Sequence, residues 1–201
     1  MELILIGILG YFIGAVPFAF VIGKVFFRID VRQHGSGNLG GSNTGRVLGK
    51  KAGVAVMTLD ILKVSLVVFL AKVLCSHPWA VALGAVCAAV GHCYPVFLHF
   101  RGGKAVATMY GFLFGLWVCC GYPCLAFFLP LVTFLVVLYL FKIVSLSSMV
   151  SALAAVAYIW LVADHVSVKA AIVFFALLII LRHHENIQRM IRGTERKIHW
   201  M

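Results

Sequence analysis

The chain has 201 residues, of which 63% are hydrophobic and 11% are charged, and its mean hydropathy is +1.07. Soluble domains carry about a quarter of charged residues, so this composition excludes an ordinary soluble domain and predicts an all-α membrane protein. Lys and Arg number 17 against 6 Asp and Glu, a formal net charge of +11. These cations stand in short loops and not in a basic soluble domain, which argues against nucleic-acid binding.

The first predicted span runs from Leu3 to Phe27 and is interrupted by glycines, Pro17 and Lys24. At about 1.5 Å of rise per residue it is long enough to cross a hydrocarbon core of about 30 Å. Pro17 removes one backbone donor, which predicts a kink. No basic cluster precedes the run and no small-residue cleavage site ends a short core, so we expect a retained helix and not a signal peptide.

After a polar island at residues 34–51, further apolar runs predict six more spans and a basic tail from Arg182 to Met201. The spans are Gly53 to Leu74, Ala80 to Leu98, Ala105 to Cys120, Leu125 to Phe141, Leu146 to Val162 and Val168 to Leu181. The second span of the chain contains Asp60 and Lys63, which share one helical face at i, i+3. Ionisable groups at that depth are costly unless they are paired. We therefore expect either a structural pair or an Asp60 that orients a cation of a catalytic loop from behind.

Seven crossings with the N-terminus outside place nearly all basic residues on one side of the membrane. The first, third and fifth loops and the tail then hold Arg28, Arg32, Arg46, Lys50, Lys51, Arg101, Lys104, Lys142, Arg182, Arg189, Arg192, Arg196 and Lys197. The opposite side holds only Lys72 and Lys169. The positive-inside rule therefore predicts cytoplasmic motif loops and a cytoplasmic C-terminus. Without a linker or a clear repeat, residues 1–201 are expected to form a single integral membrane domain.

The cysteines and histidines give no sign of a metal or cofactor site. The six cysteines lie in or beside apolar runs and are expected to be small buried hydrophobes, with a disulfide between Cys120 and Cys124 as the alternative. No histidine begins an HExxH or HxxxH pattern, so we predict no metal and no cofactor.

The polar island HGSGNLGGSNTGRVLGKK, His34 to Lys51, is the first segment that suggests chemistry. Its glycines allow positive φ and a close approach of backbone N–H groups to a ligand. Ser36, Asn38 and Asn43 add short donors, and Arg46 adds a planar fork for oxyanions. It is not a Walker loop, because Arg46 follows Gly45 where that motif needs lysine. A tight turn without ligand binding is the alternative.

The second segment is GHCYPVFLHFRGGK, Gly91 to Lys104. Gly102 and Gly103 precede Lys104 at the start of a span, so we expect backbone donors and a helix N-terminus to face an anion. Alternatively, Arg101 and Lys104 only anchor the helix at the membrane interface. His92 is either a ligand to substrate or an ordinary helix histidine with satisfied hydrogen bonds.

The third segment is RHHENIQRMIRGTERK, Arg182 to Lys197, in which Arg182 and Asn186 share a helical face close to His183. A histidine here is suited to accept a proton near neutral pH. A solvated basic tail that binds anionic headgroups is the alternative. Together the three segments predict a small phosphorylated substrate at the membrane surface, beside an apolar bundle with room for an acyl chain.

These segments resemble the three signature motifs of the bacterial acyl-phosphate:glycerol-3-phosphate acyltransferases, the PlsY family. GAVPFAFVIGK and the pair Asp60 and Lys63 extend the resemblance over nearly the whole chain. It implies seven helices with the N-terminus outside, in the bacterial cytoplasmic membrane. It also implies transfer of a fatty acyl group from acyl phosphate to the 1-hydroxyl of glycerol 3-phosphate. The products would be phosphate and lysophosphatidic acid, the first intermediate of phospholipid synthesis. The soluble enzyme that makes acyl phosphate is a candidate partner.

The resemblance places Ser36, His183 and Asn186 in the active site and assigns Arg46, Lys104, Gly102 and Gly103 to substrate binding. The remaining expected substrate contacts, taken from the residues themselves, are Asn38, Asn43, Gly37 and His92. Glu195 matches a glutamate with a structural role. The chain departs from the family pattern at Gly41 and Gly45, where bulkier residues are common, at Ala15, where serine is frequent, and at Ala105, where glycine often follows the lysine.

We expect Arg46, Lys104 and the glycine backbone to hold the phosphate of glycerol 3-phosphate, while Ser36, His183 and Asn186 orient its hydroxyl. The base is either His183 or a substrate phosphate. A covalent acyl-Ser36 route lacks a supporting triad, and the HxxxxD motif of other glycerolipid acyltransferases is absent. The alternatives are a transporter of a phosphorylated metabolite, which needs midplane ionisable residues and repeats, and a scaffold, which needs no glycine loops.

Overall fold

The computed structural model describes residues 1–198 and, within them, contains ten α-helices, two short 3-10 helices and no strand. The last three residues of the expected basic tail, 199–201, lie outside this range. The α-helices are α1 (Glu2–Ala15), α2 (Phe18–Phe27), α3 (Gly41–Leu48), α4 (Lys50–Leu74), α5 (Ala80–Cys93), α6 (Val106–Cys120), α7 (Leu125–Phe141), α8 (Val144–Val162), α9 (Val166–Arg182) and α10 (His184–Ile191). The 3-10 helices are η1 (Val31–Gln33) and η2 (Val96–Leu98).

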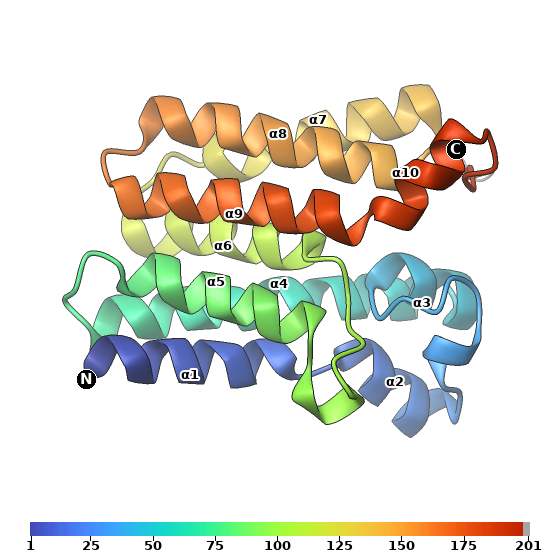
Figure 1. Ribbon diagram of the computed structural model, residues 1–201, viewed down its shortest axis with the longest axis horizontal. Coiled ribbons are helices and arrows are strands. Elements are labelled where there is room, and N and C mark those ends of the chain that lie inside the picture. The colour runs from blue at the N-terminus through green and yellow to red at the C-terminus, as the bar shows by residue number, and fades with distance from the viewer. Residues whose placement is uncertain (199–201) are drawn as a thin grey trace.

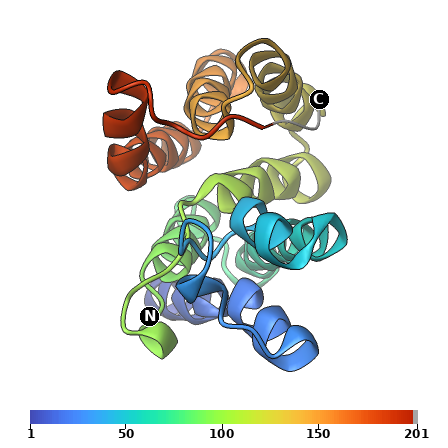
Figure 2. The same ribbon diagram turned by 90° about the vertical axis from the view of Figure 1, so that its right-hand side faces the viewer.

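The long helices run back and forth along one direction, so that loops alternate between the two ends of the bundle (Figure 1). The N-terminus lies at one end, and α3, η2 and α10 lie at the other. Helices α1, α4 and α5 lie on one side and α7, α8 and α9 on the other, with α6 between them (Figures 1 and 2). All seven predicted apolar runs are helical, which confirms the all-α expectation for the described residues.

Four segments are long and apolar enough to cross a membrane on their own: Glu2–Phe27, Lys50–Leu74, Ala80–Leu98 and Val144–Val162. The pair α9 and α10, bent by 56° at their junction, makes a fifth if it is counted as one span. Helices α6 and α7 are apolar but shorter, at 15 and 17 residues. By length and composition alone, the described residues therefore provide four or five spans, fewer than the seven predicted.

Pro17 does more than kink the first span, because it separates α1 from α2. Val16 has an extended backbone, with φ of −62° and ψ of 114°. The N–H groups of Phe20 and Val21 both donate to the carbonyl of Pro17, at 2.9 and 3.0 Å. The carbonyl of Val16 therefore has no partner within its helix, and a side chain from elsewhere supplies one, as described below.

The polar island contains a helix that the sequence analysis treated as loop. In α3, the hydroxyl of Thr44 donates to the carbonyl of Gly40 at 3.0 Å. Gly41 and Gly45 pack directly on Gly53 of α4: a Cβ on Gly53 would lie 2.6 Å from the Cα of Gly45 and 2.7 Å from the carbonyl oxygen of Gly41. These two glycines therefore allow two helices to approach closely, and neither has the positive φ that the sequence analysis associated with the glycines of the island.

The apolar core joins α4, α5, α6, α8 and α9. Phe112 of α6 and Phe175 of α9 are fully buried and stack with ring centroids 5.3 Å apart. The six cysteines are unpaired, so the alternative of a disulfide is wrong in this structure. Cys75 and Cys93 are buried as expected, whereas Cys124 is exposed. The packing of this core fixes the relative positions of the helices that carry the polar segments.

Candidate active site

The three polar segments predicted to act together lie at one end of the bundle, the end that faces the viewer in Figure 2. A small apolar cluster joins the first segment to the second: Leu39 and Leu98 pack together with Ala19, Val31 and Val56. Hydrogen bonds from the third segment reach the second, as described below. The second segment therefore contacts both of the others.

In the first segment, Asn43 holds the loop together from inside. Its side chain is 1% exposed. Its Nδ2 donates to the carbonyls of Val31 and His34 at 3.0 and 3.2 Å, and its Oδ1 accepts from the backbone N–H of Ser36 at 2.8 Å. Both side-chain donors of Asn43 are therefore used within the loop, and its direct contact with substrate stays a prediction. Asn43 fixes the backbone of Ser36.

Gly37 also serves the loop. Its φ of +69° belongs to the left-handed region, which favours glycine. Its N–H donates to the carbonyl of His34 at 3.0 Å, so it does not offer the donor to substrate that we expected. The start of the loop is held by Asp30, whose carboxylate accepts from Arg32 at 2.7 Å. This bond with Arg32 lowers the pKa of Asp30 to about 2.

Three polar side chains of the first segment keep their donors available. Ser36 and Arg46 are exposed and Asn38 is half-buried. Among residues 1–198, no hydrogen bond or ion pair engages the hydroxyl of Ser36, the amide of Asn38 or the guanidinium of Arg46. The segment thus presents a hydroxyl and an amide on a loop that is braced from within and a permanent cation on α3, which suits recognition of an oxyanion.

The glycine pair of the second segment is engaged on both sides. The N–H groups of Gly102 and Gly103 donate to the carbonyls of Cys93 and His92, at 3.1 and 3.0 Å. Their own carbonyls accept from Arg182, at 3.3 and 3.1 Å. The prediction that these N–H groups face an anion is therefore wrong, because the end of α5 uses both of them. The pair fixes the position of the residue that follows, Lys104.

His92, predicted to contact substrate, is also placed differently. It is 7% exposed, and its Nδ1 lies 3.1 Å from the ammonium of Lys63 inside the bundle. An ammonium only donates, so Nδ1 accepts and the proton of a neutral ring is on Nε2. A Cβ on Gly103 would lie 2.0 Å from that Nε2, so the ring packs against the glycine backbone. The histidine is a buried contact between α4 and the second segment.

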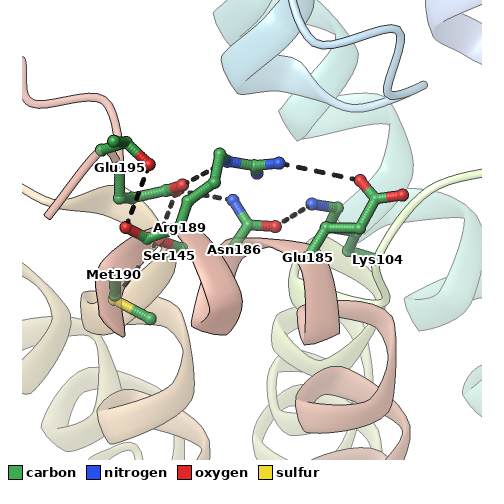
Figure 3. Close-up of polar contacts among 8 residues, drawn as sticks. Lys104, Ser145, Glu185, Asn186, Arg189, Met190 and Glu195 are labelled. Atoms are coloured by element: carbon green, nitrogen blue, oxygen red, sulfur yellow. Dashed lines mark hydrogen bonds and ion pairs between the residues drawn. The ribbon is translucent and has the colours of Figure 1, made fainter. Parts of the chain in front are cut away.

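The second and third segments are joined by a chain of polar side chains (Figure 3). The ammonium of Lys104 donates to Oδ1 of Asn186, and Nδ2 of Asn186 donates to Glu195 at 2.6 Å. Glu195 also accepts from Arg189 at 2.7 Å and from Ser145 at 2.8 Å. Lys104 and Asn186, both predicted site residues, are therefore held in direct contact.

The pKa values of this chain of contacts follow from burial and from neighbouring charge. Burial and the nearby Arg189 lower the pKa of Lys104. Burial alone would raise the pKa of Glu195, but the hydrogen bonds from Asn186, Arg189 and Ser145 outweigh it and lower the value. Glu195 is thus a stable anion that orients Asn186.

His183 stands at the bend between α9 and α10 and is 4% exposed. Its Nδ1 lies 2.7 Å from the carbonyl of Ile179, which only accepts, so Nδ1 carries the proton and Nε2 keeps its lone pair. Its pKa is lowered to about 4, mainly by burial and to a smaller extent by the positive charges of Lys104 and Arg182. His183 is therefore neutral at physiological pH, with Nε2 as a hydrogen-bond acceptor. Within residues 1–198, no group of three His, Cys, Asp or Glu side chains is arranged to hold a metal ion.

Comparison with known proteins shows the family of this chain. A family model described as glycerol-3-phosphate acyltransferase matches residues 4–193. The chain belongs to this family. The chain is 46% identical over 196 residues to the glycerol-3-phosphate acyltransferase of Geobacillus kaustophilus, covering 98% of this chain and 96% of that one. It is 44% identical over 204 residues to that of Listeria monocytogenes, covering 100% and 99%.

Two solved structures of PlsY, an integral membrane glycerol 3-phosphate acyltransferase, share the fold. The crystal structure of its glycerol 3-phosphate form superposes with a TM-score of 0.90 at 32% identity, covering 99% of this chain and 96% of that one. The lysophosphatidic acid form gives a TM-score of 0.89 with the same identity and coverage. These matches confirm the resemblance inferred from the motifs. With the apolar helices, they identify the chain as an integral membrane protein.

The sequence analysis missed two residues that contact the polar segments. Arg182 was noted only for its helical face, yet it donates to both glycine carbonyls and lies 5.1 Å from the centroid of the Tyr94 ring. Ser145, at the start of α8, was not considered and donates to Glu195. A basic residue in the last turn of an apolar helix was the one signal for Arg182. No local signal marked Ser145, because its role depends on a contact across the bundle.

One departure from the family pattern has a structural consequence. Ala105 has a φ of +61°, in the left-handed region, and is fully buried. A Cβ makes this conformation unfavourable by about 1 kcal/mol, which explains why glycine suits the position. Directly before the first turn of α6, Ala105 therefore holds strain beside Lys104.

Proposed function

We propose that the chain transfers a fatty acyl group from acyl phosphate to the 1-hydroxyl of glycerol 3-phosphate, giving lysophosphatidic acid and phosphate, the first step of membrane phospholipid synthesis. Acyltransferase activity itself follows from the family to which the chain belongs. The observation that carries the proposal is the convergence of the three polar segments at one end of an apolar bundle. There, the available groups of Ser36 and Arg46 accompany the linked pair Lys104 and Asn186.

In this proposal Arg46 and Lys104 bind the phosphate of glycerol 3-phosphate. Arg46 has no partner among the described residues, so its guanidinium can form a bidentate contact. Lys104 is positioned by the glycine pair before it and by Asn186. The glycine N–H groups of the second segment are not used, because α5 occupies them. Asn38 is the remaining amide donor of the first loop.

Ser36, His183 and Asn186 orient the 1-hydroxyl toward the carbonyl carbon of the donor. The hydroxyl oxygen attacks that carbon, and the bond between the carbonyl carbon and the phosphate oxygen breaks, releasing phosphate. Orientation of bound reactants lowers such barriers by several kcal/mol. A pKa of about 4 makes His183 a weak proton acceptor, so we assign it a hydrogen-bonding role. The hydroxyl proton then passes to a phosphate oxygen.

We also propose seven crossings, with the N-terminus outside and the motif loops and C-terminus in the cytoplasm of a bacterium. The alternation of helix direction supports an odd number of crossings, since the two termini lie at opposite ends (Figure 1). Lys and Arg gather at the motif end, as the positive-inside rule requires of a cytoplasmic face. The short helices α6 and α7 would then cross within the bundle. Residues 1–201 would form one domain.

The proposed donor is acyl phosphate, used without a cofactor, at the interface with membrane lipid. Its phosphate is a good leaving group, so little acid catalysis is needed. A soluble enzyme that forms acyl phosphate is the expected partner, since the donor hydrolyses readily in water. Nucleic acid is not an expected partner.

The test is acyl transfer by the purified protein in lipid, supplied with glycerol 3-phosphate and either palmitoyl phosphate or palmitoyl-CoA. We expect lysophosphatidic acid from palmitoyl phosphate alone, and its loss in Ser36→Ala. Product from palmitoyl-CoA would overturn the donor assignment. No product from either donor, with a folded protein, would overturn the reaction and favour the transporter alternative.

A further inference from the structure

A second polar cluster lies inside the bundle, beneath the glycine pair. Asp60 and Lys63 of α4 and His92 of α5 are 1%, 5% and 7% exposed. The ammonium of Lys63 lies 2.6 Å from Oδ1 of Asp60 and 3.1 Å from Nδ1 of His92. Removing two charges from water is costly, so a buried ion pair need not stabilise the fold. The presence of Asp60 and Lys63 inside a membrane protein therefore requires another explanation.

The break at Pro17 explains why a cation is buried here. The carbonyl of Val16 loses its intrahelical partner, because the N–H of Phe20 turns to Pro17. Lys63 donates to this carbonyl at 3.0 Å. An unpaired carbonyl in the hydrocarbon region is unfavourable, so the ammonium replaces the missing N–H. Asp60 then balances the charge of the ammonium.

His92 connects this cluster to the glycine pair. Its Nδ1 accepts from Lys63, and its Nε2 faces the backbone of Gly103, where a Cβ would lie 2.0 Å away. Its carbonyl accepts from the N–H of Gly103 at 3.0 Å. The imidazole ring therefore packs directly on Gly103, and Lys104 is the next residue.

We propose that Asp60, Lys63 and His92 are positioning residues that fix the glycine pair from behind and so place Lys104 for the phosphate of glycerol 3-phosphate. This inference rests on the proposed function. Asp60 holds the ammonium, the ammonium orients the ring, and the ring supports Gly103. From the other side, Arg182 holds the two glycine carbonyls. None of the three residues needs to touch substrate.

The test separates positioning from stability by comparing two variants. Lys63→Met leaves a buried, unpaired carboxylate and is expected to lose both thermal stability and activity. Asp60→Leu/Lys63→Met removes both charges but still leaves the Val16 carbonyl without its donor, so it is expected to unfold at a temperature between those of Lys63→Met and the wild type. Its KM for glycerol 3-phosphate should nevertheless rise about tenfold or more, with a smaller change in kcat. A stable double variant with wild-type KM would overturn the proposal.

A second variant keeps the test decisive if the double variant does not fold. His92→Gln leaves Asp60 and Lys63 paired but removes the ring that supports Gly103, and it too should raise KM. An unchanged KM in a folded His92→Gln protein would count against the proposal. Ser65→Ala is the matched control, since Ser65 is a buried polar residue of α4 that donates to Gly111 and Ile61. It should reduce stability without changing KM.

Hydrogen exchange distinguishes failure of this proposal from failure of the proposed function. In the double variant and in His92→Gln, the amides of Gly102 and Gly103 should exchange faster than in the wild type, whereas Ser65→Ala should leave them unchanged. This readout needs no substrate. Unchanged protection in both variants would overturn the positioning role even in an active enzyme, and a wild type inactive with both donors would overturn only the reaction.

Discussion

The first polar segment differs from the second and third in whether its polar side chains already have hydrogen-bond partners. In the first, the side chains of Ser36 and Arg46 have no partner among the described residues, while buried Asn43 braces the backbone beneath them. Between the second and third segments, Lys104 and Asn186 are joined to each other by a hydrogen bond. Substitutions of Ser36 and Arg46 should therefore affect catalysis alone, whereas substitutions of Lys104 and Asn186 should affect catalysis and stability together.

The largest expected effect tests the first half of this comparison. Arg46→Ala should lower kcat/KM by about 100-fold or more, the usual consequence of removing one preorganised charged donor. Its unfolding temperature should match the wild type, because no described residue depends on the guanidinium. Steady-state kinetics and thermal unfolding check this. Arg192→Ala, an exposed cation at the same end, is the control that should keep full activity.

The pH dependence of stability tests the third segment through His183. Its pKa is about 4 in the folded protein and about 6.5 unfolded, so the unfolded chain binds the extra proton first as pH falls. The free energy of unfolding should therefore decrease by about 3 kcal/mol between pH 6.5 and pH 4 on this account. Denaturant unfolding of His183→Gln should show a weaker dependence in this window. His184→Gln, at the exposed neighbouring position, should keep it, and equal slopes in all three proteins would contradict the assignment.

Glu195 tests whether orientation of Asn186 and stability are linked. Glu195→Gln keeps the size of the side chain but replaces one acceptor with a donor, opposite groups that themselves donate. It should lower the free energy of unfolding by about 2 kcal/mol and reduce kcat. Glu185→Gln is the matched control, because Glu185 is exposed and lies 3.8 Å from Arg189. That exposed pair contributes little, so a similar loss in both variants would argue against a specific role for Glu195.

The smallest expected effect concerns the strained residue beside Lys104. Ala105→Gly relieves a left-handed conformation worth about 1 kcal/mol but loses the burial of one methyl group, worth about 0.8 kcal/mol. Stability should change by less than about 1 kcal/mol, and kcat/KM should stay near the wild-type value. A large loss of activity would show that the fixed backbone at Ala105 contributes to the position of Lys104.

The sequence by itself was sufficient for the family, the helical class and the location of the three polar segments. Apolar runs long enough to span a membrane must form helices, because lipid offers no partner for backbone groups. The turn of direction at each loop then brings alternate loops to one end. The free side chains Ser36 and Arg46 were also found from sequence, since an exposed polar side chain keeps its chemistry whether it stands on a loop or on a short helix.

Only the tertiary structure decided which polar groups are already in use. The N–H groups of Gly102 and Gly103 are local features, but they are occupied by the end of α5, and their carbonyls bond an arginine about eighty positions away in sequence. His92 was predicted to contact substrate, but in the structure it is a buried neighbour of Lys63, a residue of another helix. A polar group forms its hydrogen bond with the partner that packing brings within about 3 Å. That partner can be distant in the chain, so local sequence does not identify it.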